Sequence, residues 1–269
     1  MTTPVPILSA RNLGMIFPGG TVALDGVSID LLSDEFLVVL GSSGAGKSTL
    51  LRMFNRLGTP TSGSVLFRGR DVTHASGSRL RELRQNVGMI FQQFNLVGRL
   101  TVLENVLTGR LFATTGLLGW AASHGRWFAP QDRDHAMKVL EQVGVAHLAP
   151  RRADSLSGGQ QQRVAIARML AQAPRVVLAD EPIASLDPKS AENVMDILRE
   201  IHQTQGLPVI ANLHQVDIAV KYATRIVGMK AGKIVFSGPP AQLDPATIQS
   251  LYQGRPGPHA TPHLVEPAA

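Results

Sequence analysis

The stretch LVVLGSSGAGKSTLLRMF, residues 37–54, decides how the rest of the chain is interpreted. Its start predicts a short buried strand, and its end carries apolar residues at helical spacing. The loop between them fits G-x-x-x-x-G-K-[ST], in the strand-to-helix context that this pattern requires. Backbone amides of residues 43–48 would surround phosphate oxygens, with Lys47 adding charge and the Ser48 hydroxyl facing Mg²⁺. We therefore predict a nucleoside triphosphate site formed by Gly41, Ser42, Ser43, Gly44, Ala45, Gly46, Lys47, Ser48 and Thr49.

Two further buried-strand patterns end in polar residues. VVLADE, residues 176–181, ends in two carboxylates, and LPVIANLH, residues 207–214, ends in histidine. The carboxyl ends of parallel strands meet at one ligand-binding edge. Asp180 is then expected to reach Mg²⁺ through water, and Glu181 to polarise a water that attacks the γ-phosphate. This pair indicates hydrolysis, whereas the pattern leaves His214 open between a structural role and contact with the γ-phosphate.

A second helix start follows much later in the chain. SLSGGQQQRVAIARML, residues 155–170, opens with a Gly-Gly pair and continues with apolar residues at helical spacing. Outward-facing amides at such a start suit an anion. The chain therefore has a second potential phosphate-binding helix start besides the loop at residues 41–49.

Length and composition limit the class of protein. A chain of 269 residues, 44% hydrophobic and 17% charged, suits one large domain or a core with an insertion. The absence of cysteine excludes disulfides and thiolate metal sites and suits a reducing cytoplasm. No window reaches the roughly 18 apolar residues of a membrane helix, and we expect no signal peptide.

The net charge of +6 is compatible with nucleic acid, an anionic membrane face or anionic small ligands. Basic residues are spread along the chain, and the small cluster RLRELR, residues 79–84, is interpreted as a solvated helix face. Charge alone therefore does not choose a partner.

The patterns along the chain predict an α/β fold. Residues 14–31 predict an N-terminal antiparallel β layer, and residues 225–238 predict a hairpin that turns at Ala231–Gly232. Residues 95–170 are mostly helical in pattern, with an interruption between Gly109 and Pro130. The proline-rich end predicts disorder. The expected fold is a P-loop NTPase core with a mixed sheet, an antiparallel β layer and a helical subdomain.

These motifs, in this order, resemble the nucleotide-binding subunits of the ATP-binding cassette (ABC) family. LSGGQ, residues 156–160, just before an Asp-Glu strand end, is the most specific of them. The resemblance covers a single domain, residues 7–252, with its core in 7–94 and 171–252 and its helical subdomain at about 95–170. Residues 253–269 would be a disordered tail.

The resemblance also assigns roles to individual residues. Phe17 takes the place of the aromatic that stacks on adenine. Gln92 matches the glutamine that senses Mg²⁺ and the attacking water, although the neighbouring Gln93 leaves a one-residue alternative. His214 matches the switch histidine. The signature and the loop along the dimer seam are matched by Ser157, Gly158, Gly159, Gln160, Ser185, Leu186 and Asp187.

The resemblance also explains the second helix start. In this family the signature of one subunit faces the phosphate loop of another, with two ATP molecules between them. A chain with one loop and one signature must then pair with a second copy or a homologue. ATP and Mg²⁺ are the implied cofactors.

Four functions share such a phosphate loop. A DNA-repair or chromosome ATPase would carry a long coiled coil, and a translation factor would usually carry two cassettes. A P-loop kinase explains neither LSGGQ nor the Asp-Glu pair. A transporter ATPase remains, with no nucleic acid partner. The resemblance implies docking on separate permease subunits at the cytoplasmic face of the membrane, with FNLVGRLTVLENVL, residues 94–107, near the docking groove.

FQQFNL and TVLENV look like a bacterial importer ATPase served by a substrate-binding protein. LTVLENVLTGRL, ADEPIASLDP and LHQVD (residues 213–217) are similar to the phosphonate-import branch, with Leu213 before the switch histidine. Phosphate or phosphite import is the main alternative, and amino-acid or methionine import is a weaker one.

Overall fold

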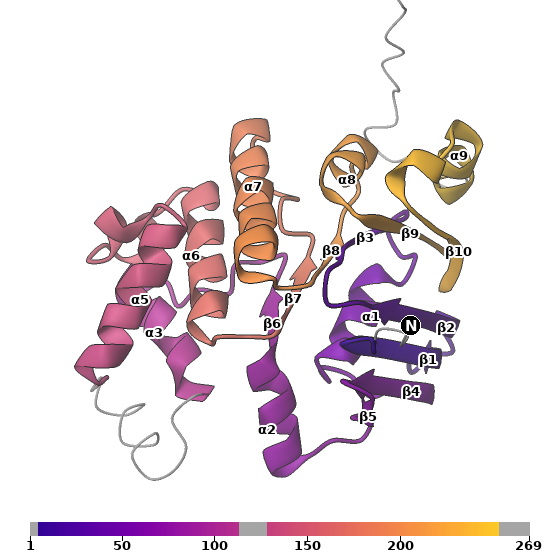
Figure 1. Cartoon of the computed structure of the whole chain (residues 1–269), viewed down its shortest axis with the longest axis horizontal. Helices are drawn as coiled ribbons and strands as arrows, with labels where there is room; N and C mark the ends of the chain where they lie inside the picture. Colours follow the sequence, from indigo (N-terminus) through magenta and orange to yellow (C-terminus); the bar gives the residue numbers. More distant parts are fainter. Residues whose placement is uncertain (1–4, 113–127, 253–269) are drawn as a thin grey trace, which may run out of the picture.

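A six-stranded mixed sheet carries the edge on which the predicted motifs meet (Figure 1). The computed structural model describes residues 5–112 and 128–252. The strand order is β10-β9-β3-β8-β7-β6, in which β9 and β10 are antiparallel and the other neighbours are parallel. The strands are β3 (Phe36–Leu40), β6 (Val87–Ile90), β7 (Val176–Asp180), β8 (Val209–Asn212), β9 (Arg225–Lys230) and β10 (Lys233–Gly238). The predicted mixed sheet is confirmed.

A four-stranded antiparallel sheet forms the second layer, in the order β2-β1-β4-β5. Its strands are β1 (Leu8–Ile16), β2 (Val22–Leu31), β4 (Ser62–Phe67) and β5 (Arg70–Asp71). The predicted antiparallel layer is therefore present, and it also includes the later strands β4 and β5. The hairpin of β9 and β10 turns at Ala231–Gly232, as predicted. Both turn residues have positive φ, 47° and 79°, as a two-residue type I′ hairpin requires.

Helices cover the six-stranded sheet, and three of them (α3, α5 and α6) pack on one another beside it (Figure 1). The α-helices are α1 (Lys47–Phe54), α2 (Gly77–Asn86), α3 (Val102–Leu107), α5 (Pro130–Gln142), α6 (Gly158–Ala171), α7 (Pro188–Gln205), α8 (Val216–Tyr222) and α9 (Pro245–Tyr252). Short 3₁₀ segments are η1 (Thr108–Phe112), η2 (Ala146–Leu148), η3 (Ala153–Ser155) and η4 (Pro240–Gln242).

The predicted interruption of the helical segment begins in η1 and lies mostly outside the described residues, as does the predicted tail. The domain boundaries stay predictions. In the described ranges no helix is both long and apolar enough to cross a bilayer.

The central sheet is buried on both faces. Along β3, Phe36, Val38 and Leu40 belong to one hydrophobic cluster, whereas Leu37 and Val39 belong to another. All five are fully buried because α6, α7 and their neighbours lie on one face, and α1, α2 and the antiparallel layer pack on the other. This burial explains why the strands read as continuous apolar runs rather than as alternating patterns.

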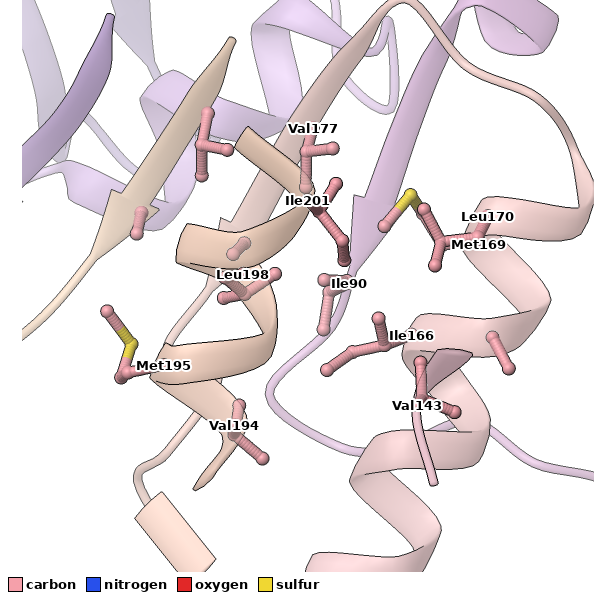
Figure 2. Close-up of a cluster of buried hydrophobic side chains, with 14 of the residues drawn as sticks. Ile90, Val143, Ile166, Met169, Leu170, Val177, Val194, Met195, Leu198 and Ile201 are labelled. Atoms are coloured by element: carbon pink, nitrogen blue, oxygen red, sulfur yellow. The ribbon is translucent and has the colours of Figure 1, made fainter. Parts of the chain in front are cut away.

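Helices α6 and α7 pack on the hydrophobic cluster that contains Phe36, Val38 and Leu40. Figure 2 shows Ile166 of α6 and Ile201 of α7 beside the strand residues Ile90 and Val177. On α7 the buried residues follow helical spacing: Ala191, Val194, Met195, Leu198 and Ile201. This packing fixes where α7 and the strand-end loop before it lie.

Leu198→Ala should lower the free energy of unfolding by about 3 kcal/mol, because it leaves a cavity in a fully buried cluster. Asn193→Ala, on the exposed face of the same helix, should change it by less than about 0.5 kcal/mol. Urea unfolding followed by circular dichroism measures both. Equal midpoints for the two variants would contradict the role of α7 in the core.

Candidate active site

The phosphate loop joins β3 to α1. Gly44 and Gly46 have positive φ, 82° and 102°. A Cβ atom on Gly46 would lie 2.4 Å from the carbonyl oxygen of Ala23, so β2 approaches the loop too closely for any other residue. Helix α1 begins after Gly46 with no side-chain cap and no acidic residue in its first turn. Its first amides are therefore free to bind an anion.

Lys47 is almost fully buried inside this loop. Its Nζ donates to the carbonyl oxygens of Gly41 at 2.8 Å and Ser42 at 3.2 Å. Burial lowers the pKa of Lys47, while the nearby carboxylates of Glu181 and Asp180 act in the opposite direction. The loop thus holds a cation where the phosphates are predicted to bind, beside the two acids at the end of β7.

Asp180 lies directly against the phosphate loop. Its Oδ1 accepts hydrogen bonds from Ser48 Oγ at 2.7 Å and from Asn212 Nδ2 at 2.8 Å. Both Asp180 and Asn212 are buried. The hydroxyl and the carboxylate that were predicted to face Mg²⁺ are therefore neighbours. Asn212 was not predicted, and its only signal in the sequence is an amide inside the apolar run of β8.

Glu181 receives contacts on both carboxylate oxygens. His214 Nε2 lies 2.7 Å from Oε1, and Gln92 Nε2 donates to Oε2 at 2.9 Å. The three residues follow the neighbouring strands β7, β8 and β6, so the predicted convergence at one sheet edge is observed. In the described structure Gln92, and not Gln93, makes this contact. Glu181 has a positive φ of 51°, an uncommon conformation that clusters at functional sites.

The surroundings of Glu181 favour its ionised form. The hydrogen bond with His214 lowers the pKa of Glu181 below its usual value of 4.5, and partial burial opposes this. The charges of His214 and Lys47 lower it further. An ionised carboxylate is the form that can accept a hydrogen bond from water.

The signature residues form the start of α6. Ser157 caps this helix: its Oγ accepts from the Gln160 amide at 3.4 Å, and its own amide donates to Gln160 Oε1 at 3.0 Å. A Cβ on Gly159 would lie 2.7 Å from Ser190 Oγ, so the signature packs on the start of α7. Asp187 caps α7 by accepting from the Ser190 amide at 3.0 Å. Ser157 itself is exposed.

The signature does not lie beside the phosphate loop of its own chain. In Figure 1, α6 and α1 are on opposite sides of strands β6, β7 and β8. The structure therefore brings together the loop, Asp180, Glu181, His214 and Gln92, and leaves the signature residues and Asp187 apart from them.

Phe17 lies in the turn between β1 and β2. Its side chain is exposed, as an adenine-stacking residue must be before nucleotide binds. Since β2 contacts the phosphate loop at Gly46, the β1–β2 turn belongs to the same part of the molecule as the loop. No contact of Phe17 with the loop is found in the described residues.

Arg168 is a second residue that was not predicted. From α6 it donates to the carbonyl oxygens of Asn95 at 2.5 Å and Phe94 at 3.0 Å. Burial lowers the pKa of this guanidinium. It therefore ties the signature helix to the segment directly after Gln92. Its only signal in the sequence is its position as one of two arginines in a mostly buried helix.

Comparison with known proteins agrees with this geometry. The family model described as ABC transporter matches residues 24–184. The chain belongs to the ABC transporter family. It is therefore an ATP-binding cassette ATPase with the P-loop fold that was predicted.

Individual relatives cover most of the chain. Over 246 residues, 91% of this chain, it is 51% identical to a "Phosphonates import ATP-binding protein PhnC" of Thiobacillus denitrificans, covering 92% of that protein. A second phosphonates import ATP-binding protein, from Halalkalibacterium halodurans, is 47% identical over 247 residues, covering 92% of this chain and all of the relative.

A solved structure shares the fold. It is a dimeric post-hydrolysis state of the ATP-binding cassette MJ0796 bound to ADP and Pi, with a TM-score of 0.76 and 31% identity. The match covers 87% of this chain and 98% of that one.

Glu181→Gln should change how stability depends on pH. Because folding lowers the pKa of Glu181, its stabilising contribution is present above the usual carboxyl value of 4.5 and is lost as pH falls through the lowered pKa. The difference in thermal midpoint between wild type and Glu181→Gln should therefore shrink on acidification below that value. Differential scanning fluorimetry across pH 7 to pH 3 tests this. A difference that grows on acidification would mean that the carboxylate is not stabilised as described.

Proposed function

We propose that this chain is the ATP-hydrolysing subunit of a bacterial phosphonate importer, in which ATP-driven closure of a dimer is coupled to uptake. The observation that carries this proposal is the identity of about half of the residues, over nearly the full length, with relatives named phosphonates import ATP-binding proteins. The site described above supplies the chemistry that such a subunit needs.

Hydrolysis in this site would use Glu181 to orient and polarise the attacking water. The water oxygen forms a bond to the γ-phosphorus, and the bond to the β–γ bridging oxygen breaks, leaving ADP and phosphate. His214 and Gln92 hold the two carboxylate oxygens of Glu181, so that its orientation is fixed before the water arrives. Lys47 places its charge on the phosphates, where negative charge shifts during transfer.

The side chains beside the phosphate loop are suited to binding Mg²⁺. The ion is held in such sites by one or two protein oxygens, together with phosphate oxygens and water. Ser48 Oγ and Asp180 Oδ1 are 2.7 Å apart and supply a hydroxyl and a carboxylate, and Gln92 lies at the neighbouring strand end. In the described ranges no group of three or more His, Cys, Asp or Glu could hold a metal, which suits an ion shared with phosphates. Bound Mg²⁺ would neutralise phosphate charge.

A second copy would complete the nucleotide site. The exposed Ser157 and the free amides at the start of α6 suit a γ-phosphate, yet they lie away from the loop of their own chain. A head-to-tail pair places each signature over the partner's loop, with ATP between them. The dimeric form of the similar cassette bound to ADP and Pi supports this arrangement.

The remaining partners follow from importer function. Permease subunits would receive this chain at the cytoplasmic face of the membrane, near the segment of residues 94–107 and the helices α3, α5 and α6. A substrate-binding protein would act through the assembled complex. The cargo does not touch the residues of the ATP site, so phosphate or phosphite import is the alternative that the experiment must separate.

Uptake of labelled 2-aminoethylphosphonate, measured in cells that depend on this chain, tests the proposal. Lys47→Ala should lower uptake on the order of 10²–10³-fold, because one preorganised charge is removed from the transferred phosphate. Lys233→Ala, an exposed lysine on β10, is the matched control and should leave uptake unchanged, because its exposed ion pair with Asp25 contributes little. Labelled phosphate, supplied in parallel, should be taken up normally in all three strains. If Lys47→Ala lost phosphate uptake and kept phosphonate uptake, the assignment of the cargo would be wrong. The proposed ATPase activity would still stand.

A further inference from the structure

Tyr252, the last residue of α9, reaches the nucleotide site from the C-terminal end of the described chain. Its hydroxyl donates to the carbonyl oxygen of His214 at 3.0 Å. The backbone of Gly41, the first residue of the phosphate loop, acts on the pKa of the same hydroxyl, so the phenol lies beside this loop. One phenol group is therefore bonded to the segment that carries the switch histidine and lies next to the loop that surrounds the phosphates.

We infer that Tyr252 is a positioning residue for ATP hydrolysis. Its hydroxyl holds the main chain of His214 against the start of the phosphate loop and thereby sets where the imidazole meets Glu181. Three successive contacts connect the tyrosine to Glu181, the residue predicted to polarise the attacking water, and to its partner Gln92: Tyr252 to His214 at 3.0 Å, His214 to Glu181 at 2.7 Å, and Gln92 to Glu181 at 2.9 Å.

Helix α9 is fixed firmly enough to act as a support. Leu251 is 1% exposed and belongs to the core cluster, and a Cβ on Gly228 would lie 2.7 Å from its side chain. Lys230 Nζ donates to the carbonyl oxygen of Ser250 at 2.8 Å, which holds the last turn of the helix against β9. The position of Tyr252 is therefore set by the contacts of the two residues before it.

The start of the phosphate loop is built for this close approach. Gly41 has a φ of 151°, and a Cβ there would lie 2.2 Å from the carbonyl oxygen of Met229 in β9. Only glycine lets β9, on which α9 packs, come so near to the loop. Burial also raises the pKa of Tyr252 to about 12, so the hydroxyl remains a proton donor throughout the physiological range.

The chain offers a matched control because it has only two tyrosines. The other is Tyr222, at the end of α8, which is 6% exposed. Its hydroxyl donates to Asp196 Oδ1 at 2.9 Å, away from the nucleotide site. Tyr252→Phe and Tyr222→Phe therefore each remove one hydroxyl and one hydrogen bond, and both keep the ring.

ATP hydrolysis by the purified full chain should separate the two variants. Tyr252→Phe should lower kcat about two- to tenfold, the value of one hydrogen bond to a positioned group, with KM for ATP changed less than roughly twofold. Tyr222→Phe should keep the wild-type kcat. Wild-type kcat in Tyr252→Phe, or an equal loss in both variants, would overturn the inference, since a general packing effect explains the second result.

A spectroscopic readout tests this placement without turnover. Full chain labelled with ¹³C at the tyrosine Cζ gives two resonances, which Tyr222→Phe assigns. Addition of ATP without Mg²⁺ should shift the Tyr252 resonance and leave that of Tyr222 in place, because only Tyr252 lies beside the phosphate loop. An unmoved Tyr252 resonance at saturating ATP would also overturn the inference. The measurement of kcat depends on the proposed hydrolysis, whereas the resonance measurement does not. A wild-type chain that binds ATP without hydrolysing it would contradict the proposed function, and the Tyr252 resonance would still test the inference.

Discussion

The paired contact at Glu181 is the constraint on which the rest of the site depends. One carboxylate is held on both oxygens by His214 and Gln92, which come from the ends of the strands that flank its own. Such a contact requires three strands in parallel order with matched ends. The buried faces of the central sheet provide that order, because continuous apolar strands are stable only when both faces are covered. The core thus positions the chemistry at the sheet edge.

The phosphate loop and the signature lie apart in the described part of one chain, and the proposed function joins them across two copies. The phosphate loop and the acids gather on one side of the sheet, whereas the signature caps α6 in the helical part (Figure 1). The capping box of Ser157 and Gln160 satisfies the amides of these two residues and leaves the serine exposed. A helix start that is ordered and exposed in this way is prepared for an anion that another copy brings. Arg168 links this helix to the segment directly after Gln92.

Residues with local patterns were predictable from the sequence, and residues that act through distant contacts were not. The phosphate loop, Asp180 and Glu181 each follow an apolar strand, and the hairpin at Ala231–Gly232 follows from turn chemistry. The convergence of His214 on Glu181 followed from the parallel order of the strands, whereas Gln92 was indicated by the family resemblance. Three supporting contacts gave no such signal: those of Asn212, Arg168 and Tyr252. Each joins segments that are far apart in sequence, and only the packed fold places them together.

Cross-linking between two differently labelled copies tests the head-to-tail site most directly. The chain has no cysteine, so Ser43→Cys in the phosphate loop and Ser157→Cys in the signature are unique thiols. Both are placed in chains that carry Glu181→Gln, to hold the closed state, and the two are mixed with a short bismaleimide. The account predicts that ATP promotes links between Ser43→Cys and Ser157→Cys chains and not between two Ser157→Cys chains. Links between like chains, or no dependence on ATP, would contradict a site that is shared by two copies.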